Sequence, residues 1–229
     1  MDNTLGFQGA IFDLDGTLLD SMHVWKEIDL EFLAKRGFDV PLGYSESLAG
    51  LSFRETAEYT IATFGLKENP YDIMQEWNQM AIEAYRNKVR LKPHAEEYLL
   101  WLKERGIRLA VCTALSRKLY VPALQNNRIY ELFDAFVSTD DVNRGKNFPD
   151  AYLLAASRLG LAPQDCVVFE DILPAIHGAL AANMQVYGVF DPASEHDREE
   201  IERITQGYLY DFREMMIEPK ETIIGNSPD

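Results

Sequence analysis

The sequence predicts an α/β fold: a three-layer α/β/α core on a parallel sheet, with an α-helical cap domain inserted into it. One observation is that apolar runs typical of buried strands alternate with helical patterns of about 10–12 residues from Pro93 onward. Another is that about 90 residues separate the first apolar run from the next, whereas a crossover between parallel strands needs only about a dozen. Because helical patterns fill that interval, we expect core residues 1–18 and 91–229 and cap residues 19–90.

Helices in the insertion are indicated by apolar residues at helical spacing and by start and stop signals. Ser52 and Glu55 have the form of a capping box, and Asn69 precedes Pro70 as an N-cap precedes a first-turn proline. Gly37 is a suitable helix stop. The expected helices are 22–36, 52–64 and 69–88, with a turn-rich stretch at 38–50.

The second part of the chain predicts the remaining core elements, and the tail after Glu218 is expected to be disordered. The expected strands after the first are 107–112, 135–138, 166–170, 185–189 and a short 208–210, and the expected helices are 93–105, 117–127, 149–159, 174–182 and 194–204.

Composition limits the classes of partner. The chain has 229 residues, a hydrophobic fraction of 47%, and a formal net charge of −15, which argues against binding to nucleic acid or to an anionic membrane surface. An anionic substrate would have to be attracted by a local cation. Cys112 and Cys166 each lie in an apolar run, so we expect reduced core thiols and a cytoplasmic protein without a signal peptide or membrane span. A monomer is the expected state.

The most informative stretch is Gly9 to Ser21, where an apolar run meets Asp13 and Asp15 and then Gly16. Side chains two apart in a strand share a face, so the two carboxylates are expected to converge at the strand end. Like charges this close need a cation, a shared proton or a catalytic purpose. A solvated acidic turn is the alternative interpretation.

Further polar residues follow other predicted strands. Thr113 ends the second, Lys146 lies in the loop after the third, and Glu170 with Asp171 ends the fourth. Carboxyl ends of parallel strands meet at one edge of the sheet, where ligands bind. Taken alone, Thr113 is better explained as a strand end and Lys146 as a solvated loop lysine. Together, the oxygen ligands suit Mg²⁺, and the lysine and hydroxyl suit a phosphate.

These residues, in this order, resemble the four motifs of the haloacid dehalogenase (HAD) superfamily, and the insertion resembles the C1 cap of the group that includes β-phosphoglucomutase and many small phosphatases. The resemblance implies a Rossmann-like core. It also implies that Asp13 attacks phosphorus to give an aspartyl phosphate, and that Asp15 acts as general acid and base. Thr113 and Lys146 would hold the phosphoryl oxygens.

The resemblance further implies a magnesium site. Asp13, the backbone carbonyl of Asp15, and Asp171 would hold Mg²⁺, with Glu170 acting through a water. Two departures from the family pattern put loop geometry and cap docking in question: Asn147 follows Lys146 where proline is usual, and Ile172 stands where many members have serine.

The second acid favours phosphate-ester chemistry, because dehalogenases of the superfamily lack a residue matching Asp15. The predicted function is a Mg²⁺-dependent phosphatase acting on a small phosphorylated metabolite. A β-phosphoglucomutase-like sugar phosphomutase is the alternative, because residues 48–55 resemble that enzyme's specificity loop and Arg54 would bind substrate phosphate. Against it, Trp25 stands where the mutase has histidine, and His23 is two residues short.

Two other classes fit less well. A response-regulator receiver also gathers acids, threonine and lysine on a parallel sheet, but it is about half this length and has no helical insertion. A pseudo-enzyme would lack a catalytic group, and none is missing. His94, His177 and His196 are scattered and are expected to be surface or packing residues.

Overall fold

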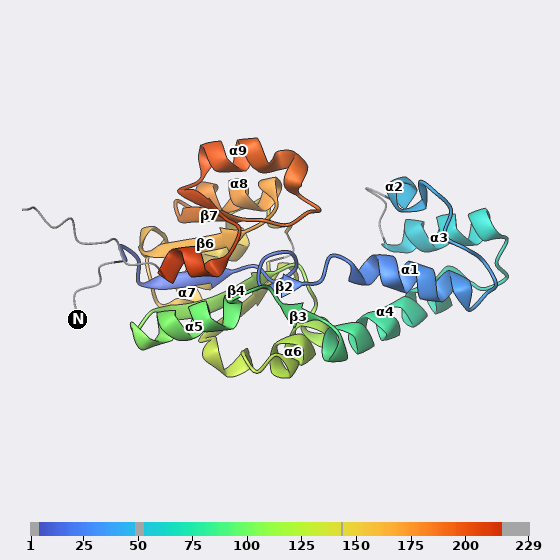
Figure 1. Cartoon of the computed structure of the whole chain (residues 1–229), viewed down its shortest axis with the longest axis horizontal. Helices are drawn as coiled ribbons and strands as arrows, with labels where there is room; N and C mark the ends of the chain where they lie inside the picture. Colours follow the sequence, from blue (N-terminus) through green and yellow to red (C-terminus); the bar gives the residue numbers. More distant parts are fainter. Residues whose placement is uncertain (1–4, 49–52, 143, 217–229) are drawn as a thin grey trace, which may run out of the picture.

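The computed structural model describes residues 5–48, 53–142 and 144–216, and its centre is a six-stranded parallel sheet in the order β5-β4-β1-β6-β7-β8 (Figure 1). The strands are β1 (Gly9–Phe12), β4 (Arg108–Thr113), β5 (Ala135–Ser138), β6 (Cys166–Glu170), β7 (Gln185–Val189) and β8 (Gly207–Leu209). The chain adds β4 and β5 on one side of β1 and the later strands on the other. In such sheets, the crevice at the carboxyl end of the strand where the order reverses binds ligands, and here that strand is β1.

The two faces of the sheet are covered by different helices. Each strand contributes side chains to both faces, because alternate residues of a strand point to opposite sides. Phe12 lies on one face, where its ring stacks on that of Phe169 at 4.7 Å between centroids. Ile11 lies on the other face, in the buried cluster that also contains Tyr152. The first face packs against α5 (Ala95–Glu104) and α6 (Arg117–Asn126), and the second against α7 (Asp150–Leu159), α8 (Leu173–Ala181) and α9 (Arg198–Ile204).

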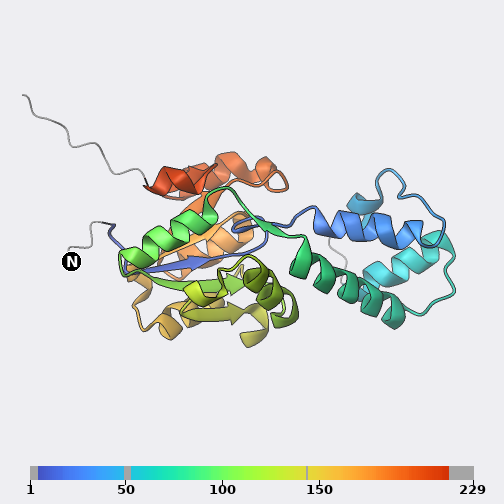
Figure 2. The same cartoon turned by 60° about the horizontal axis from the view of Figure 1, so that its bottom comes forward.

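Most of the chain between β1 and α5 is helical and stands beyond one end of the sheet, as Figures 1 and 2 show. It is joined to the core by two short strands that pair antiparallel, with Leu19 opposite Leu91 and Asp20 opposite Arg90. Helix α4 (Pro70–Asn87) packs against core helix α6. The elements of this segment are β2 (Leu19–Asp20), α1 (Val24–Ala34), α2 (Tyr44–Leu48), α3 (Phe53–Phe64), α4 (Pro70–Asn87) and β3 (Arg90–Leu91).

Most predicted elements are confirmed, and the predicted fold class is confirmed with them. Asn69 caps α4, because its side chain accepts a hydrogen bond from the amide of Asp72 at 3.0 Å, and Gly160 ends α7 with a φ of 68°. The capping box at Ser52 and the tail after Glu218 lie outside the described residues.

In three details the structure differs from the prediction. The stretch 38–50 was predicted only as turn-rich, and the helix α2 within it was missed. The helix expected over 194–204 is a 3₁₀ turn, η4 (Glu195–Asp197), followed by α9. Strands β2 and β3 were not predicted, because two residues are too few to show a period.

Within the part of the chain that the structure describes, we find no helix whose length and apolar character would let it cross a lipid bilayer.

Candidate active site

The turn after β1 brings the first predicted site residues to the sheet edge. Strand β1 ends at Phe12, and Asp13 and Asp15 follow it. Gly16 has a φ of +79°, and a Cβ there would lie 2.2 Å from Oδ2 of Asp171. Only glycine lets the turn approach so closely. The next residue, Thr17, donates a hydrogen bond from Oγ1 to Oδ1 of Asp171 at 3.0 Å, which joins this turn to the end of β6.

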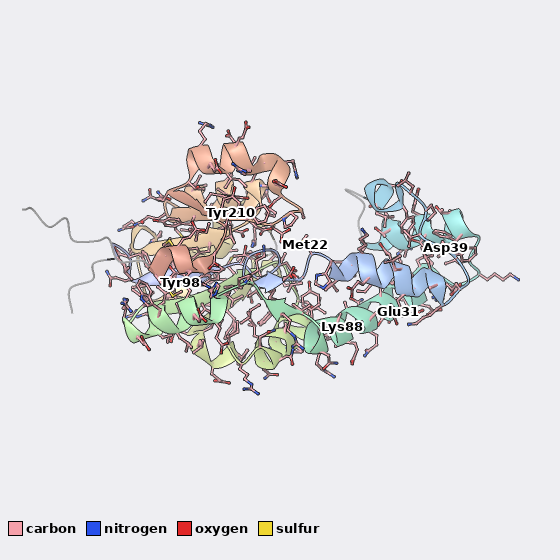
Figure 3. All side chains as sticks on the ribbon, in the orientation of Figure 1. Met22, Glu31, Asp39, Lys88, Tyr98 and Tyr210 are labelled. Carbon is pink, nitrogen blue, oxygen red and sulfur yellow. The ribbon has the colours of Figure 1, made fainter. Side chains whose placement is uncertain are left out.

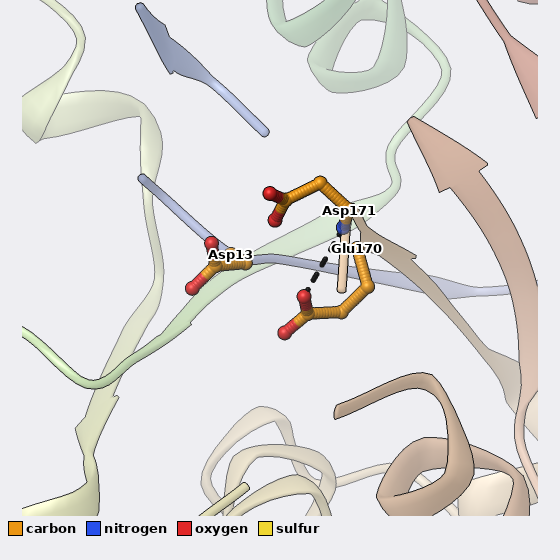
Figure 4. A group of neighbouring side chains, drawn as sticks. All are labelled: Asp13, Glu170 and Asp171. Atoms are coloured by element: carbon orange, nitrogen blue, oxygen red, sulfur yellow. Dashed lines mark hydrogen bonds between the residues drawn. The ribbon is translucent and has the colours of Figure 1, made fainter. Parts of the chain in front are cut away.

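Three carboxylates gather where β1 and β6 end, and Figure 4 shows their side chains close together. Asp13, Glu170 and Asp171 are all buried, and each offers an oxygen within 4.8 Å of those of the other two. Burial and the charge of Asp13 raise the pKa of Glu170 to about 7. Burial and the charges of Asp13 and Glu170 raise the pKa of Asp171 to about 8. A buried cluster of oxygens that resists ionisation without a counter-charge fits a hard divalent cation.

Lys146 supplies one positive charge to this cluster. Its Nζ pairs with Oδ1 of Asp13 and Oε1 of Glu170, and it donates a hydrogen bond to the carbonyl oxygen of Cys112 at 3.2 Å. Burial alone lowers the pKa of Lys146, but the carboxylates of Asp13 and Glu170 outweigh that effect and raise it. The interpretation of Lys146 as a solvated loop lysine is therefore wrong. Tyr152, which was not predicted, donates to Oε1 of Glu170 at 2.9 Å.

Asp15 is held by two hydroxyl groups that were not among the predicted site residues. Ser21, just after β2, donates from Oγ to Oδ1 of Asp15 at 2.6 Å, and Tyr85 of helix α4 donates to the same oxygen at 2.8 Å. Burial raises the pKa of Asp15 to about 6, and the charge of Asp13 adds to this effect. Near neutral pH this carboxyl group can both give and take a proton.

These groups open into a cleft of about 840 Å³ between the sheet edge and the helical insertion. Thr113 ends β4 and lines the cleft, and its Oγ1 accepts a hydrogen bond from the amide of Leu115 at 3.1 Å. Met22 lies at the junction of insertion and core in Figure 3. The residues lining the cleft are Asp13, Asp15, Ser21, Met22, Trp25, Tyr85, Thr113, Ala114, Thr139, Asp140, Arg144, Gly145, Lys146, Asn147, Asp171, Ile172, Pro174 and Ala175.

Arg54 is not among the residues that line this cleft. Its side chain is 76% exposed, and its Nε pairs with Oε1 of Glu58 on the same helix at 2.9 Å. The histidines also stay outside: His94 begins α5 and pairs with Asp211 at 2.8 Å, while His177 and His196 are exposed. The structure thus brings together every predicted catalytic and metal-binding residue, but not Arg54.

The arrangement defines a class of enzyme. A buried carboxylate beside a lysine, a second carboxyl group whose pKa burial raises to about 6, and an acidic cluster lie at the switch point of a parallel sheet. The chain belongs to the family of haloacid dehalogenase-like hydrolases, whose family model matches residues 10–189.

Several curated relatives are similar over most of their length. Hexitol phosphatase A from Escherichia coli (strain K12) is 33% identical over 201 residues, which cover 86% of this chain and 89% of the relative. A phosphorylated carbohydrates phosphatase from Thermotoga maritima is 25% identical over 183 residues, covering 80% and 85%. The solved structure of a Thermotoga maritima protein with the provisional name β-phosphoglucomutase superposes with a TM-score of 0.82 at 23% identity, covering 92% and 97%, and shows the same fold.

Proposed function

We propose that this protein is a Mg²⁺-dependent phosphatase that hydrolyses the phosphoric monoester of a small metabolite through an aspartyl phosphate on Asp13. The observation that carries the proposal is the placement of Asp15. Its carboxyl group lines the same cleft as Asp13, and its pKa is raised to about 6, mainly by burial. A group of that kind protonates a leaving oxygen in one step and activates water in the next.

The residues divide the work of two steps. In the first, a carboxylate oxygen of Asp13 attacks phosphorus, the bond to the ester oxygen breaks, and Asp15 gives that oxygen its proton. In the second, Asp15 takes a proton from a water molecule that attacks phosphorus, which frees Asp13 and inorganic phosphate. Thr113 and Lys146, which line the cleft beside Asp13, would hold the phosphoryl oxygens.

The metal-binding residues would be Asp13, Asp171, Glu170 and the backbone carbonyl of Asp15. The clustered oxygens of the three acids support this assignment. A bound Mg²⁺ would supply positive charge for the phosphoryl oxygens during transfer.

A sugar or sugar-alcohol phosphate is the substrate class that we propose. The relatives include proteins named as phosphatases of hexitols, phosphorylated carbohydrates and fructose 1-phosphate. The helical insertion presents Met22, Trp25 and Tyr85 to the cleft, all without charge. Such a wall suits an uncharged carbon skeleton better than a second phosphate or a carboxylate.

Hydrolysis is favoured over phosphomutation by the same wall. A mutase has to hold a second phosphate, and Arg54, the residue expected to do so, pairs with Glu58 and does not line the cleft. Trp25 occupies the lining position at which the mutase has histidine.

We also propose that the chain divides into a core of residues 1–18 and 91–229 and a cap of residues 19–90. The pairing of β2 with β3 supports this division, because it brings together the segment that leaves the core and the segment that returns to it. Cys112 and Cys166 are buried and unpaired, which supports a reducing compartment such as the cytoplasm.

The test is phosphate release from a panel of phosphorylated metabolites, with Mg²⁺ and with EDTA. The panel includes β-glucose 1-phosphate, with a coupled assay for glucose 6-phosphate. We expect Asp13→Asn to lower the rate by about 10³-fold or more, because the nucleophile is lost. Asp39→Asn, the same change at an exposed site on the insertion, is the control and should keep full activity. Unchanged turnover in Asp13→Asn would contradict the mechanism, and glucose 6-phosphate without free phosphate would identify a mutase.

A further inference from the structure

We propose that Tyr85 and Ser21 are positioning residues that confine the transferable proton of Asp15 to its Oδ2 atom. In this arrangement the helical insertion completes the general acid. The inference rests on the proposed function, because it concerns the acid step of that reaction.

The contacts that support the inference converge on one atom. The hydroxyls of Ser21 and Tyr85 donate to Oδ1 of Asp15 at 2.6 Å and 2.8 Å. Both donors are 1% exposed, so water does not compete freely for these hydrogen bonds. All three residues line the cleft into which Asp13 and Lys146 also open.

Two donors on Oδ1 decide where the proton resides. A carboxyl group protonated at Oδ2 keeps both hydrogen bonds, whereas a proton on Oδ1 would have to displace at least one of them. The loss of one such hydrogen bond disfavours the Oδ1 form by about tenfold. Oδ2, which accepts neither hydroxyl, therefore carries the proton that is transferred.

The donors come from different parts of the chain. Ser21 is six positions from Asp15 and follows strand β2, while Tyr85 is 70 positions away on helix α4. Asp15 thus has one local donor and one that depends on how α4 lies against the sheet edge. A displacement of α4 by about 1 Å would stretch the hydrogen bond from Tyr85 beyond a useful length.

The transfer of the proton from Asp15 to the ester oxygen determines which substrates a variant of Tyr85 or Ser21 should hydrolyse more slowly. As the bond between Asp13 and phosphorus forms and the bond from phosphorus to the ester oxygen breaks, the proton on Oδ2 of Asp15 passes to the ester oxygen. The product leaves as an alcohol, and Asp15 is left as a carboxylate that still accepts from Ser21 and Tyr85. A sugar alkoxide needs that proton, whereas p-nitrophenolate is a stable anion and leaves without it.

The experiment compares leaving groups in the full-length protein with Mg²⁺. The quantity compared is kcat/KM, which covers the steps up to transfer of the phosphoryl group to Asp13, because the later hydrolysis of the aspartyl phosphate is the same for every ester. We expect Tyr85→Phe to lower kcat/KM by about 10-fold or more for sorbitol 6-phosphate, by less for phenyl phosphate and by under about 3-fold for p-nitrophenyl phosphate. Tyr98→Phe is the matched control, because Tyr98 (Figure 3) is fully buried and its hydroxyl has no hydrogen-bond partner among the described residues. It should leave all three rates unchanged.

Ser21→Ala gives an independent variant in case Tyr85→Phe does not fold, and it should show the same order of effects across the three substrates. An equal loss on all substrates in the folded variants would mean a merely structural role and would overturn the inference, as would no loss on any of them. If the unaltered protein hydrolyses neither the three esters nor any member of the metabolite panel, the proposed function is wrong, and the inference that rests on it is wrong as well. Activity of the unaltered protein together with a flat leaving-group dependence in the variants overturns the inference alone.

Discussion

At the scale of single residues, Gly16 sets how closely the turn after β1 approaches Asp171. Gly16→Ala would place a Cβ 2.2 Å from Oδ2 of Asp171, so either the carboxylate of Asp171 or the turn after β1 has to shift. We expect kcat/KM to fall by about 10²-fold, because displacements of about 1 Å at reacting groups have effects of that size. Gly37→Ala is the control.

Gly37 also has a positive φ, of +81°, but nothing lies within 4 Å of its added Cβ. Both variants pay about 1–2 kcal/mol for a non-glycine residue in a left-handed conformation, which thermal unfolding would record. Only Gly16→Ala should lose activity. Equal activity in the two variants would mean that Asp171 or the turn after β1 can shift without consequence.

Much of the site could be predicted from single residues, because its acids directly follow apolar runs that had to be strands. Asp13 and Asp171 are examples. Tyr85 could not be predicted, since it lies in a helix with an ordinary amphipathic pattern and nothing local indicates that its hydroxyl reaches Asp15. Arg54 shows the reverse case: a familiar motif indicated a contact with substrate, but its side chain is 76% exposed and paired with Glu58.

At the scale of elements, helix α1 carries a partly buried carboxylate, that of Asp29. Burial raises the pKa of Asp29 to about 6 from its ordinary value of 3.8. A carboxyl group whose pKa is higher in the folded state than in the unfolded state destabilises the fold at any pH at which it is ionised. This destabilisation disappears as the pH falls below both the folded-state and the unfolded-state pKa. The ionised Asp29 should therefore cost stability above about pH 6 and almost none near pH 4.

Asp29→Asn should therefore raise the free energy of unfolding at about pH 8 by about 1–2 kcal/mol, after allowance for the solvent that still screens the side chain. The gain should shrink toward zero at about pH 4, as measured by denaturant unfolding. Asp39→Asn, the same change at an exposed position on the same insertion, is the control. A gain that did not vary with pH would show that lost charge is not the cause.

Element lengths also explain which parts of the fold could be predicted. Strands such as β4 and helices such as α4 are long enough for their period to show, whereas β2 and β3 have two residues each. The pairing of β2 with β3 joins residues about 70 apart in sequence, and only the fold brings them together.

At the scale of the whole molecule, metal binding should be linked to stability and to pH. The acidic cluster repels itself in the metal-free fold, so Mg²⁺ that binds only the folded state should raise Tm. The corresponding gain is about 2.7 kcal/mol at 100 times Kd. Because the pKa values of Asp171 and Glu170 are raised to about 8 and about 7, protons compete with the metal as the pH falls through this range.

The Mg²⁺-dependent rise in Tm should therefore be larger at about pH 8.5 than at about pH 6. Differential scanning fluorimetry across that range measures it. Asp171→Asn should abolish the Mg²⁺-dependent rise in Tm at both pH values, and Asp39→Asn should not alter that rise. A rise that persisted in Asp171→Asn would place the metal elsewhere.

The antiparallel pairing of Leu19 with Leu91 has an evolutionary consequence. The chain leaves the sheet edge and returns to it at neighbouring points, so the length of the inserted segment does not affect the geometry of the sheet. Segments inserted at such places are readily exchanged. A lineage could therefore acquire a new substrate preference by recombining this module as a unit while the strands stay intact. The contact of Tyr85 with Asp15 limits that freedom, because an incoming module has to restore a hydroxyl at the same point.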